Sequence, residues 1–291
     1  MKTTGLFTTH KVVINQPCDR PIKIIPFGDV HRDSDMHCGT KWREFLAYAK
    51  GQKDAYFLGM GDYFDGMSTS EREGLSRSSL HNTTIKNIEK LYSEWIERMS
   101  KELEFMKGRL IGMLGGNHFF SFNSGMSSDT ILCQNLEARF LGVCSFIRLS
   151  IHTQANQPIG RGRAACFDIF AHHGAGGGST PGATFNTIEK MQQTADADLY
   201  LMGHDHKKGC IPSFPRLRLS EGKGSLAIRE RTPWLGRTGS FLKAYEDGTV
   251  SYNVDAARSA CALGWIEFDI NVKRVHTGST EHMEVSVRGT C

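Results

Sequence analysis

The sequence predicts an α/β fold, and three observations point to it. Five short apolar runs that suit buried strands are each followed directly by a loop rich in Asp, Asn and His. Amphipathic stretches with helical spacing separate several of these runs, and short strand-like segments dominate after residue 210. The 291 residues suffice for one large α/β domain or two small ones. Because no clean linker is visible, we expect one domain over 1–291, with a motif-bearing part at about 22–210 and a strand-rich, basic part at about 211–291.

The first half of the chain alternates strands with helices. Its clearest helix covers 83–107, where apolar residues recur at spacings of one, three or four and charges fill the other face. Gly108 is placed to end this helix. In order, we expect a strand at 22–27, a helix at 42–49, a strand at 55–60, a polar loop at 66–79, the helix at 83–107, a strand at 110–114 and a helix at 129–140.

The second half continues the alternation and then becomes richer in strands. A strand at 167–171, a short helix at 188–194 and a strand at 199–202 complete the motif-bearing part. The remainder reads as short strands at 225–228, 249–254, 265–272 and 283–287.

Composition and cysteine spacing indicate a soluble cytoplasmic protein. No apolar run approaches the roughly 20 residues that cross a bilayer, and the N-terminus lacks the apolar core of a secretory signal. The eight cysteines lie far apart and none forms a Cys-x-x-Cys pair, so we expect free thiols in a reducing compartment. We therefore expect no membrane partner.

Five motifs in a fixed order carry the chemistry, and each follows a predicted strand. Loops at strand ends converge on one edge of a sheet, so their carboxylate, amide and imidazole groups can build a site for two metal ions. The motifs are Asp-Val-His at 29–31, Gly-Asp-Tyr-Phe-Asp at 61–65, Gly-Asn-His at 116–118, His-His-Gly at 172–174 and Gly-His-Asp-His at 203–206.

In order and in strand context, these motifs resemble the calcineurin-like metallophosphoesterase superfamily. The resemblance covers roughly residues 22–210. It implies a four-layer α/β/β/α sandwich, in which two mixed sheets are flanked by helices and the site lies at one sheet edge. The loop at 61–65 also resembles the corresponding loop of DNA repair exonucleases.

The resemblance implies two divalent metal ions. Manganese is expected, with iron, zinc or nickel as alternatives that suit imidazole and carboxylate ligands. The ligands would be Asp29, His31 and His206 for the first ion, Asn117, His204 and a late histidine for the second, and Asp62 between them.

The late histidine has two candidates, His172 and His173. We favour His173, because His173-Gly174 matches the form found in many members of the superfamily. His172 would then lie behind the ligands or face the substrate.

His118 is expected to act on the leaving group, as a general acid or as a donor to phosphate. Members of the superfamily usually carry Asp or Glu directly after Gly-Asn-His, and this acid orients the catalytic histidine. Here the position is Phe119, so another residue must orient His118. Asp65 is a candidate for orienting a metal ligand.

These features predict a hydrolase that uses a metal-bridging hydroxide to cleave phosphate esters. Residues 207–243 hold nine basic residues against two acidic ones, which favours a polyanion such as nucleic acid as substrate, and hence a nuclease or nucleotide phosphodiesterase. A phosphomonoesterase and a non-catalytic scaffold of the same fold are the alternatives. The candidate substrate-binding residues are Arg216, Arg218, Arg229 and Arg231.

Overall fold

The structure is a computed structural model of the chain. It describes residues 5–17, 20–68, 71, 72, 74, 81–153, 164–178, 180–222, 225–277 and 280–291. Within these ranges the backbone alone is described at 220–222, 225, 227, 229, 252, 274, 276, 277 and 280–282.

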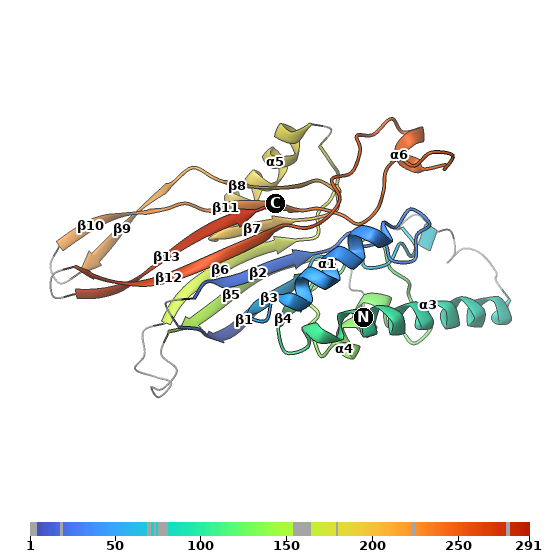
Figure 1. Cartoon of the computed structure of the whole chain (residues 1–291), viewed down its shortest axis with the longest axis horizontal. Helices are drawn as coiled ribbons and strands as arrows, with labels where there is room; N and C mark the ends of the chain where they lie inside the picture. Colours follow the sequence, from blue (N-terminus) through green and yellow to red (C-terminus); the bar gives the residue numbers. More distant parts are fainter. Residues whose placement is uncertain are drawn as a thin grey trace.

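Two mixed sheets face each other, and a two-stranded ribbon extends from one of them (Figure 1). The five-stranded sheet has the order β13 (Thr280–Thr290), β12 (Glu267–Thr277), β2 (Ile22–Phe27), β3 (Ala55–Gly59) and β4 (Leu110–Met113). The six-stranded sheet has the order β1 (Phe7–Asn15), β5 (Cys144–His152), β6 (Ala164–His172), β7 (Leu199–Met202), β11 (Trp234–Thr238) and β8 (Lys208–Pro212). The ribbon pairs β9 (Arg216–Gly222) with β10 (Ser225–Arg231).

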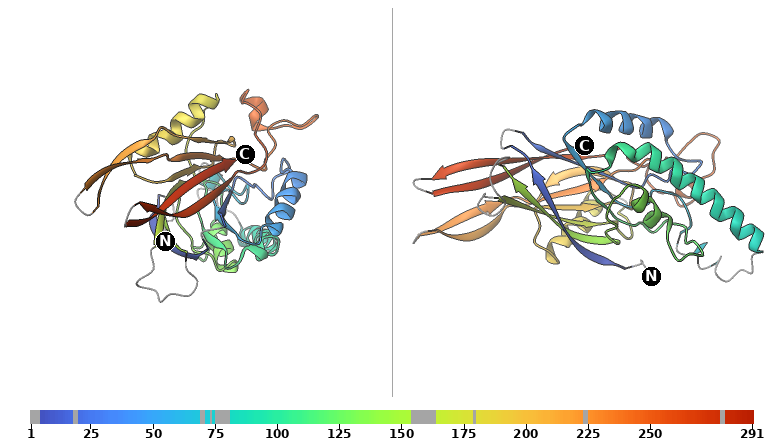
Figure 2. Two further views of the ribbon diagram at one scale, coloured as in Figure 1. Left: turned by 60° about the vertical axis from the view of Figure 1, so that its left-hand side comes forward. Right: turned by 90° about the horizontal axis from the view of Figure 1, so that it is seen from below.

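Helices cover the outer faces of both sheets, which confirms the predicted four-layer sandwich (Figure 2). On the five-stranded sheet lie α1 (Gly39–Gly51), α3 (Asn82–Leu103) and α4 (Ser128–Asn135). On the six-stranded sheet lies α5 (Pro181–Glu189), followed by a 3₁₀ turn at Lys190–Gln193. A short helix, α6 (Tyr252–Asp255), stands outside these layers.

The core between the sheets is built from strand residues that alternate in and out. Ile24 and Leu58 of one sheet and Leu149 and Phe167 of the other are fully buried in the same cluster. Burying such a side chain contributes about 1.5–3 kcal/mol, so the two sheets are held face to face. A second cluster, which includes Trp42 and Phe45 of α1, fixes the helices against the five-stranded sheet.

Strand direction places the motifs. β2, β3 and β4 run parallel to one another, and β6 runs parallel to β7. Each motif lies at or just after the carboxyl end of one of these five strands, since the motifs begin at residues 29, 61, 116, 172 and 203. The sheets therefore bring the five loops to one edge of the sandwich.

Several predicted elements change in the structure. The strand expected at 249–254 is wrong, since residues 249–251 form neither helix nor strand and α6 begins at Tyr252. The helix expected at 188–194 is also displaced, because α5 begins at Pro181 behind a Thr180 cap and only a 3₁₀ turn follows it. The helix at 129–140 ends at Asn135. Most of the predicted loop at 66–79 lies outside the described residues.

Strands from the basic C-terminal part are built into both sheets: β11 pairs with β7, and β12 pairs with β2. The single domain expected from the sequence stays a prediction. No helix in the described ranges is long and apolar enough to cross a membrane. The seven cysteines that the structure describes carry free thiols.

Candidate metal centre

An unusual backbone conformation turns the candidate ligands toward one point. Among the described residues, seven other than glycine have positive φ, and five of these are candidate ligands: Asp29, His31, Asp62, His204 and His206. Asp and His tolerate this left-handed region better than bulky residues, yet it still costs free energy. Strain concentrated at the ligands indicates that the fold holds them in place for a function.

Two glycines make room for the ligand loops. A Cβ at Gly116 would lie 1.9 Å from Oδ1 of Asp62, and one at Gly61 would lie 2.6 Å from Nδ1 of His173. Gly61 also has φ 96°, which favours glycine. The glycines of the Gly-Asp and Gly-Asn motifs therefore allow the loops after β3, β4 and β6 to approach closely.

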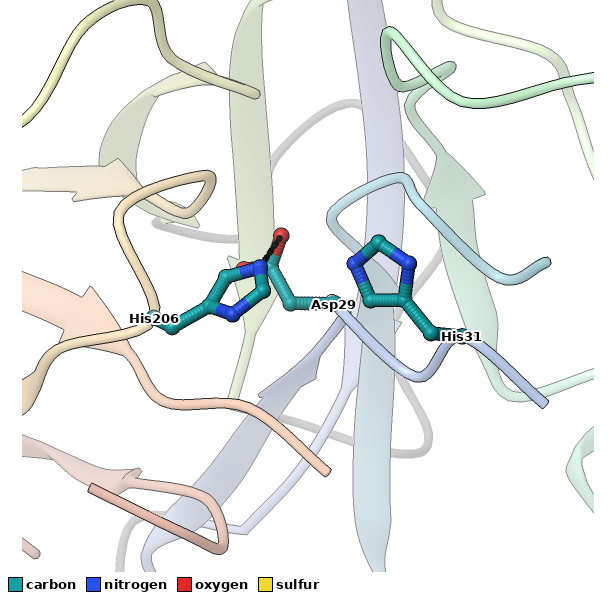
Figure 3. A group of neighbouring side chains, drawn as sticks. All are labelled: Asp29, His31 and His206. Carbon is teal, nitrogen blue, oxygen red and sulfur yellow. Dashed lines mark ion pairs between the residues drawn. The ribbon is translucent and has the colours of Figure 1, made fainter. Parts of the chain in front are cut away.

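The first ligand cluster contains Asp29, His31 and His206, whose candidate ligand atoms lie within 4.8 Å of one another (Figure 3). Oδ1 of Asp29 lies 3.8 Å from Nε2 of His206. Asp29 is fully buried, and its carboxylate accepts the backbone N–H of His204 at 2.9 Å. The loop after β2 is thus tied to the loop after β7.

The second cluster contains Asp62, His173 and His204, and Asn117 lies beside it. Oδ1 of Asn117 is 3.0 Å from Nε2 of His173 and 2.7 Å from Nδ1 of His204. Oδ2 of Asp62 lies 3.3 Å from Nε2 of His173 and 3.8 Å from Nε2 of His31. Asp62 therefore stands between the two clusters, where the sequence predicted a bridging ligand.

The donor set fits divalent cations. Nε2 of His31 is buried and has no hydrogen-bond partner in the described part of the chain. Its other nitrogen, Nδ1, lies 2.8 Å from Oδ1 of Asp65. A proton on Nδ1 leaves the lone pair of Nε2 free toward the cluster, as in metal-binding histidines. In His173, Nδ1 likewise lies close to an acceptor, 2.8 Å from the carbonyl of Met60, while Nε2 faces Oδ1 of Asn117.

The electrostatics of the metal-free site depend on a buried ion pair. Burial alone would lower the pKa of His173, but the facing Asp62 carboxylate raises it to about 9. Burial would raise the pKa of Asp62, and the His173 imidazolium holds it well below its usual range instead. Burial raises the pKa of Asp29 to about 7 and lowers that of His206 to about 3. Without metal, the protein therefore retains a proton on His173 at neutral pH.

We predict that metal binding releases this proton. A ligating histidine must be neutral, so affinity should rise by about tenfold per pH unit from pH 7 toward the His173 pKa of about 9. Near pH 7, calorimetry in two buffers with different ionisation enthalpies should detect release of about one proton or more per chain. His172→Ala should leave this release unchanged. Metal affinity that is independent of pH over this range would contradict the assignment.

Asp65 orients His118, which answers the question raised by Phe119. Nδ1 of His118 lies 2.6 Å from the backbone carbonyl of Asp65 and 3.8 Å from its Oδ1. The same carboxylate faces Nδ1 of His31. One residue thus positions two histidines. The Phe119 ring meanwhile packs under the guanidinium of Arg72, 3.7 Å from the ring centre.

The two late histidines point to different places. His173 is buried among the ligands, whereas His172 ends β6 and its Nδ1 accepts the backbone N–H of Gly174 at 2.7 Å. His172 belongs to none of the ligand clusters found among the described residues. The geometry therefore favours His173 as the ligand.

We expect His173→Ala to remove the second metal and His172→Ala to retain both. The first change deletes a nitrogen facing Asp62 and Asn117, while the second affects a loop hydrogen bond. Metal content by elemental analysis, or anomalous scattering from each variant, measures the difference. The opposite order would assign the ligand to His172.

Two buried side chains that motif reasoning missed support the ligand loops. Arg237 is 1% exposed; it donates to the carbonyl of Gly203 at 3.1 Å and lies 3.3 Å from Oδ2 of Asp205. It thus holds the loop that carries His204 and His206. Asp129 is buried behind the Gly-Asn-His loop, where it accepts the N–H of Gly116 at 3.2 Å. In the sequence Arg237 was only one of nine basic residues, and Asp129 stood in no motif.

The four candidate substrate arginines belong to the β9–β10 ribbon and not to the ligand loops. Arg216 and Arg218 pair with Asp196, and Arg231 pairs with Asp196 and Asp198. The side chain of Arg229 lies outside the described part. The ribbon extends from the end of β8 and β11 that is remote from the site, because Thr238 pairs with Lys208 near the site and Trp234 pairs with Pro212 at the far end.

A cavity of about 1040 Å³ opens over the ligands. His31, Asp62, His204 and His206 line it, and so do His118 and Asp65. This volume is at the upper end of the range found for ligand sites, roughly 300–1,000 Å³. The candidate centre is therefore accessible to a substrate larger than a single phosphate group.

Comparison with known proteins gives only distant likenesses. No protein-family model matches the chain, and no curated protein matches it. Among solved structures, Vacuolar Protein Sorting 29 from Cryptosporidium parvum is 14% identical, covering 94% of this chain and 100% of its own, with a TM-score of 0.37. Vps29 from Entamoeba histolytica complexed with Zn²⁺ is 12% identical, covering 91% and 98%, with a TM-score of 0.39. The function proposed below therefore depends on this chain's own residues.

Proposed function

We propose that this chain is a metal-dependent phosphoesterase that hydrolyses phosphodiesters. The observation that carries the proposal is the convergence of Asp62, His173 and His204 with Asp29, His31 and His206 at one sheet edge, below an open cavity. Carboxylates and imidazoles at this density, on a strained backbone, are typical of a site that holds metal and acts on a substrate.

The chain's residues would hold two divalent ions. Asp29, His31 and His206 would bind the first, Asn117, His173 and His204 the second, and Asp62 both. When bound, such ions activate water for attack on phosphorus and neutralise charge on the phosphoryl oxygens. Manganese suits this mixed oxygen and nitrogen set, and so do iron, zinc and nickel.

His118 would protonate the leaving oxygen. Its ring lines the cavity, and Nδ1 is held by the carbonyl of Asp65. In the imidazolium form both ring nitrogens carry protons. Nδ1–H can therefore stay bonded to Asp65 while Nε2–H is given to the leaving group.

A phosphodiester is favoured over a monoester by the size and lining of the cavity. A monoester needs room for one group beyond the phosphate, whereas a diester extends on both sides of it. The cavity of about 1040 Å³ reaches well beyond the ligands and is also lined by Lys207 and Lys243.

Two aryl substrates test the proposal. The metal-loaded protein should hydrolyse bis(p-nitrophenyl) phosphate faster than p-nitrophenyl phosphate, and chelation should stop both reactions. A strong preference for the monoester would make the chain a phosphomonoesterase. Absence of hydrolysis with Mn²⁺, Fe²⁺, Zn²⁺ and Ni²⁺ in turn would overturn the proposal.

A further inference from the structure

Residues 242–261, here called the roof segment, leave the fold and return to it at the metal centre. Just before the segment, the N–H of Phe241 donates to the carbonyl of Asp29 at 2.9 Å. Just after it, the N–H of Ala262 donates to the carbonyl of His206 at 3.2 Å. Both ends are thus tied to loops that carry candidate ligands. A long loop whose two ends lie close together commonly has a function.

Contacts within the roof segment hold it in shape. The hydroxyl of Ser251 donates to the carbonyl of Ala244 at 2.7 Å, and the N–H of Arg258 donates to the carbonyl of Asn253 at 2.9 Å. From the motif side, Nζ of Lys207 donates to the carbonyl of Ala260 at 3.3 Å. The segment therefore has defined contacts both within itself and with the base of the site.

The roof segment lines a large part of the cavity. Residues from Leu242 to Cys261 share the lining with His31, His118 and His204. Figure 1 shows α6, which belongs to this segment, at the opposite end of the molecule from the β9–β10 ribbon. Among the described residues, the lysines and arginines that line the cavity are Lys207, Lys243 and Arg258.

The roof segment contributes basic residues to the cavity lining. The segment contains two basic residues, Lys243 and Arg258, and three acidic ones, Glu246, Asp247 and Asp255. Both basic residues line the cavity, and none of the three acidic residues does. Nζ of Lys243 also pairs with Oε1 of Glu246. The segment still brings a lysine and an arginine to the cavity, and such groups attract an anion that extends along them.

We propose that the roof segment binds the phosphates that flank the scissile one, so that the substrate is a strand of nucleic acid. Lys243 and Arg258 are the contacts, and Lys207 extends the same line at the base of the segment. This inference rests on the proposed function, because flanking phosphates matter only if the protein hydrolyses phosphodiesters. It differs from the sequence-based prediction, which gave this role to the arginines of the ribbon.

Direct binding tests the inference separately from turnover. The probe is a fluorescent single-stranded DNA oligonucleotide with phosphorothioate linkages, which resist hydrolysis, titrated into the metal-loaded protein across a salt series. Lys243→Ser/Arg258→Ser should raise Kd on the order of tenfold and flatten the salt dependence, by about 0.7 in slope for each lost contact. Arg216→Ser/Arg218→Ser removes the same charge from the remote ribbon and should change neither.

Metal content and circular dichroism should match the parent in both variants, which shows that they fold, and hydrolysis of bis(p-nitrophenyl) phosphate by the parent protein is measured alongside. If the parent protein cleaves this diester but does not bind the oligonucleotide, the inference is overturned and the proposed function stands. If Lys243→Ser/Arg258→Ser (the roof variant) binds the oligonucleotide like the parent, the roof segment does not contact the phosphates. The same conclusion follows if Arg216→Ser/Arg218→Ser (the ribbon variant) weakens binding as much as the roof variant does. If no diester is cleaved while the roof variant alone weakens binding, the inference stands and the proposed function fails.

Discussion

Replacing Asp62 with asparagine is expected to abolish phosphoester hydrolysis and to lower metal occupancy. The Asp62 carboxylate faces both His31 and His173, so it supplies negative charge to both halves of the centre. Its Oδ1 also accepts the N–H of His118 at 2.9 Å. The asparagine amide has nearly the same shape as the Asp62 carboxylate but carries no negative charge. Because the metal contribution is worth several kcal/mol, turnover should fall by at least about 10³-fold.

Elemental analysis and the rate of diester hydrolysis measure the effect of Asp62→Asn. Asp54→Asn is the matched control, since Asp54 is an exposed carboxylate at the other end of β3. The control should retain the parent's metal content and rate. An Asp62→Asn variant that held both metals and turned over at the parent rate would remove Asp62 from the centre.

His118→Ala is expected to retain the metals and to slow turnover by about 10²–10⁴-fold, the usual contribution of a general acid. The residue is positioned by Asp65 and lines the cavity. Its ring contacts that of His31, with 5.1 Å between the ring centres, but it is not a member of the Asp29, His31 and His206 cluster. The loss should be smaller for a p-nitrophenyl ester, because that leaving group departs without a proton. It should be larger for an alkyl ester.

The two leaving groups act as an internal control for His118→Ala. An equal loss with both esters would mean that His118 binds phosphate and does not transfer a proton. A collapse of metal content would instead make His118 a ligand, together with His31 and Asp65, which lie within reach of it.

The fold class followed from the sequence because each motif marks the end of a buried strand. The layers and the converging loops were predictable on this basis. The edge strand β1 was not, because only one residue in Phe7–Asn15 is fully buried and its parallel partner β5 lies some 137 residues later. Apolar runs reveal buried strands, whereas a half-exposed strand depends on a pairing that sequence does not show.

The order of the ligands was also predictable, but their orientation was not. The sequence showed that Phe119 occupies the position of the acid that usually orients the catalytic histidine. It did not show which residue orients His118 instead. In the structure the main-chain carbonyl of Asp65 positions His118. Any residue can supply a main-chain carbonyl. Backbone groups carry no sequence signal, so a contact of this kind is visible only in the fold.

Residues 207–243 show that basic residues close to a metal motif in sequence can lie far from it in the fold. Lys207 follows the last metal motif directly, but β8, which begins at Lys208, then extends away at about 3.3 Å per residue. The arginines of the ribbon therefore lie at the far end, and Asp196 and Asp198 pair with three of them. Residues near the site return from the C-terminal side, as Lys243 and Arg258 do.

The most direct test of the account is a metal titration followed by activity on one sample. Metal-free protein titrated with Mn²⁺ should bind about two ions per chain, and hydrolysis of bis(p-nitrophenyl) phosphate should rise in step with occupancy. Asp62→Asn in the same titration should show neither full occupancy nor activity. Protein that binds no divalent ion, or that binds two and leaves the diester intact with every metal tried, would contradict the central claim.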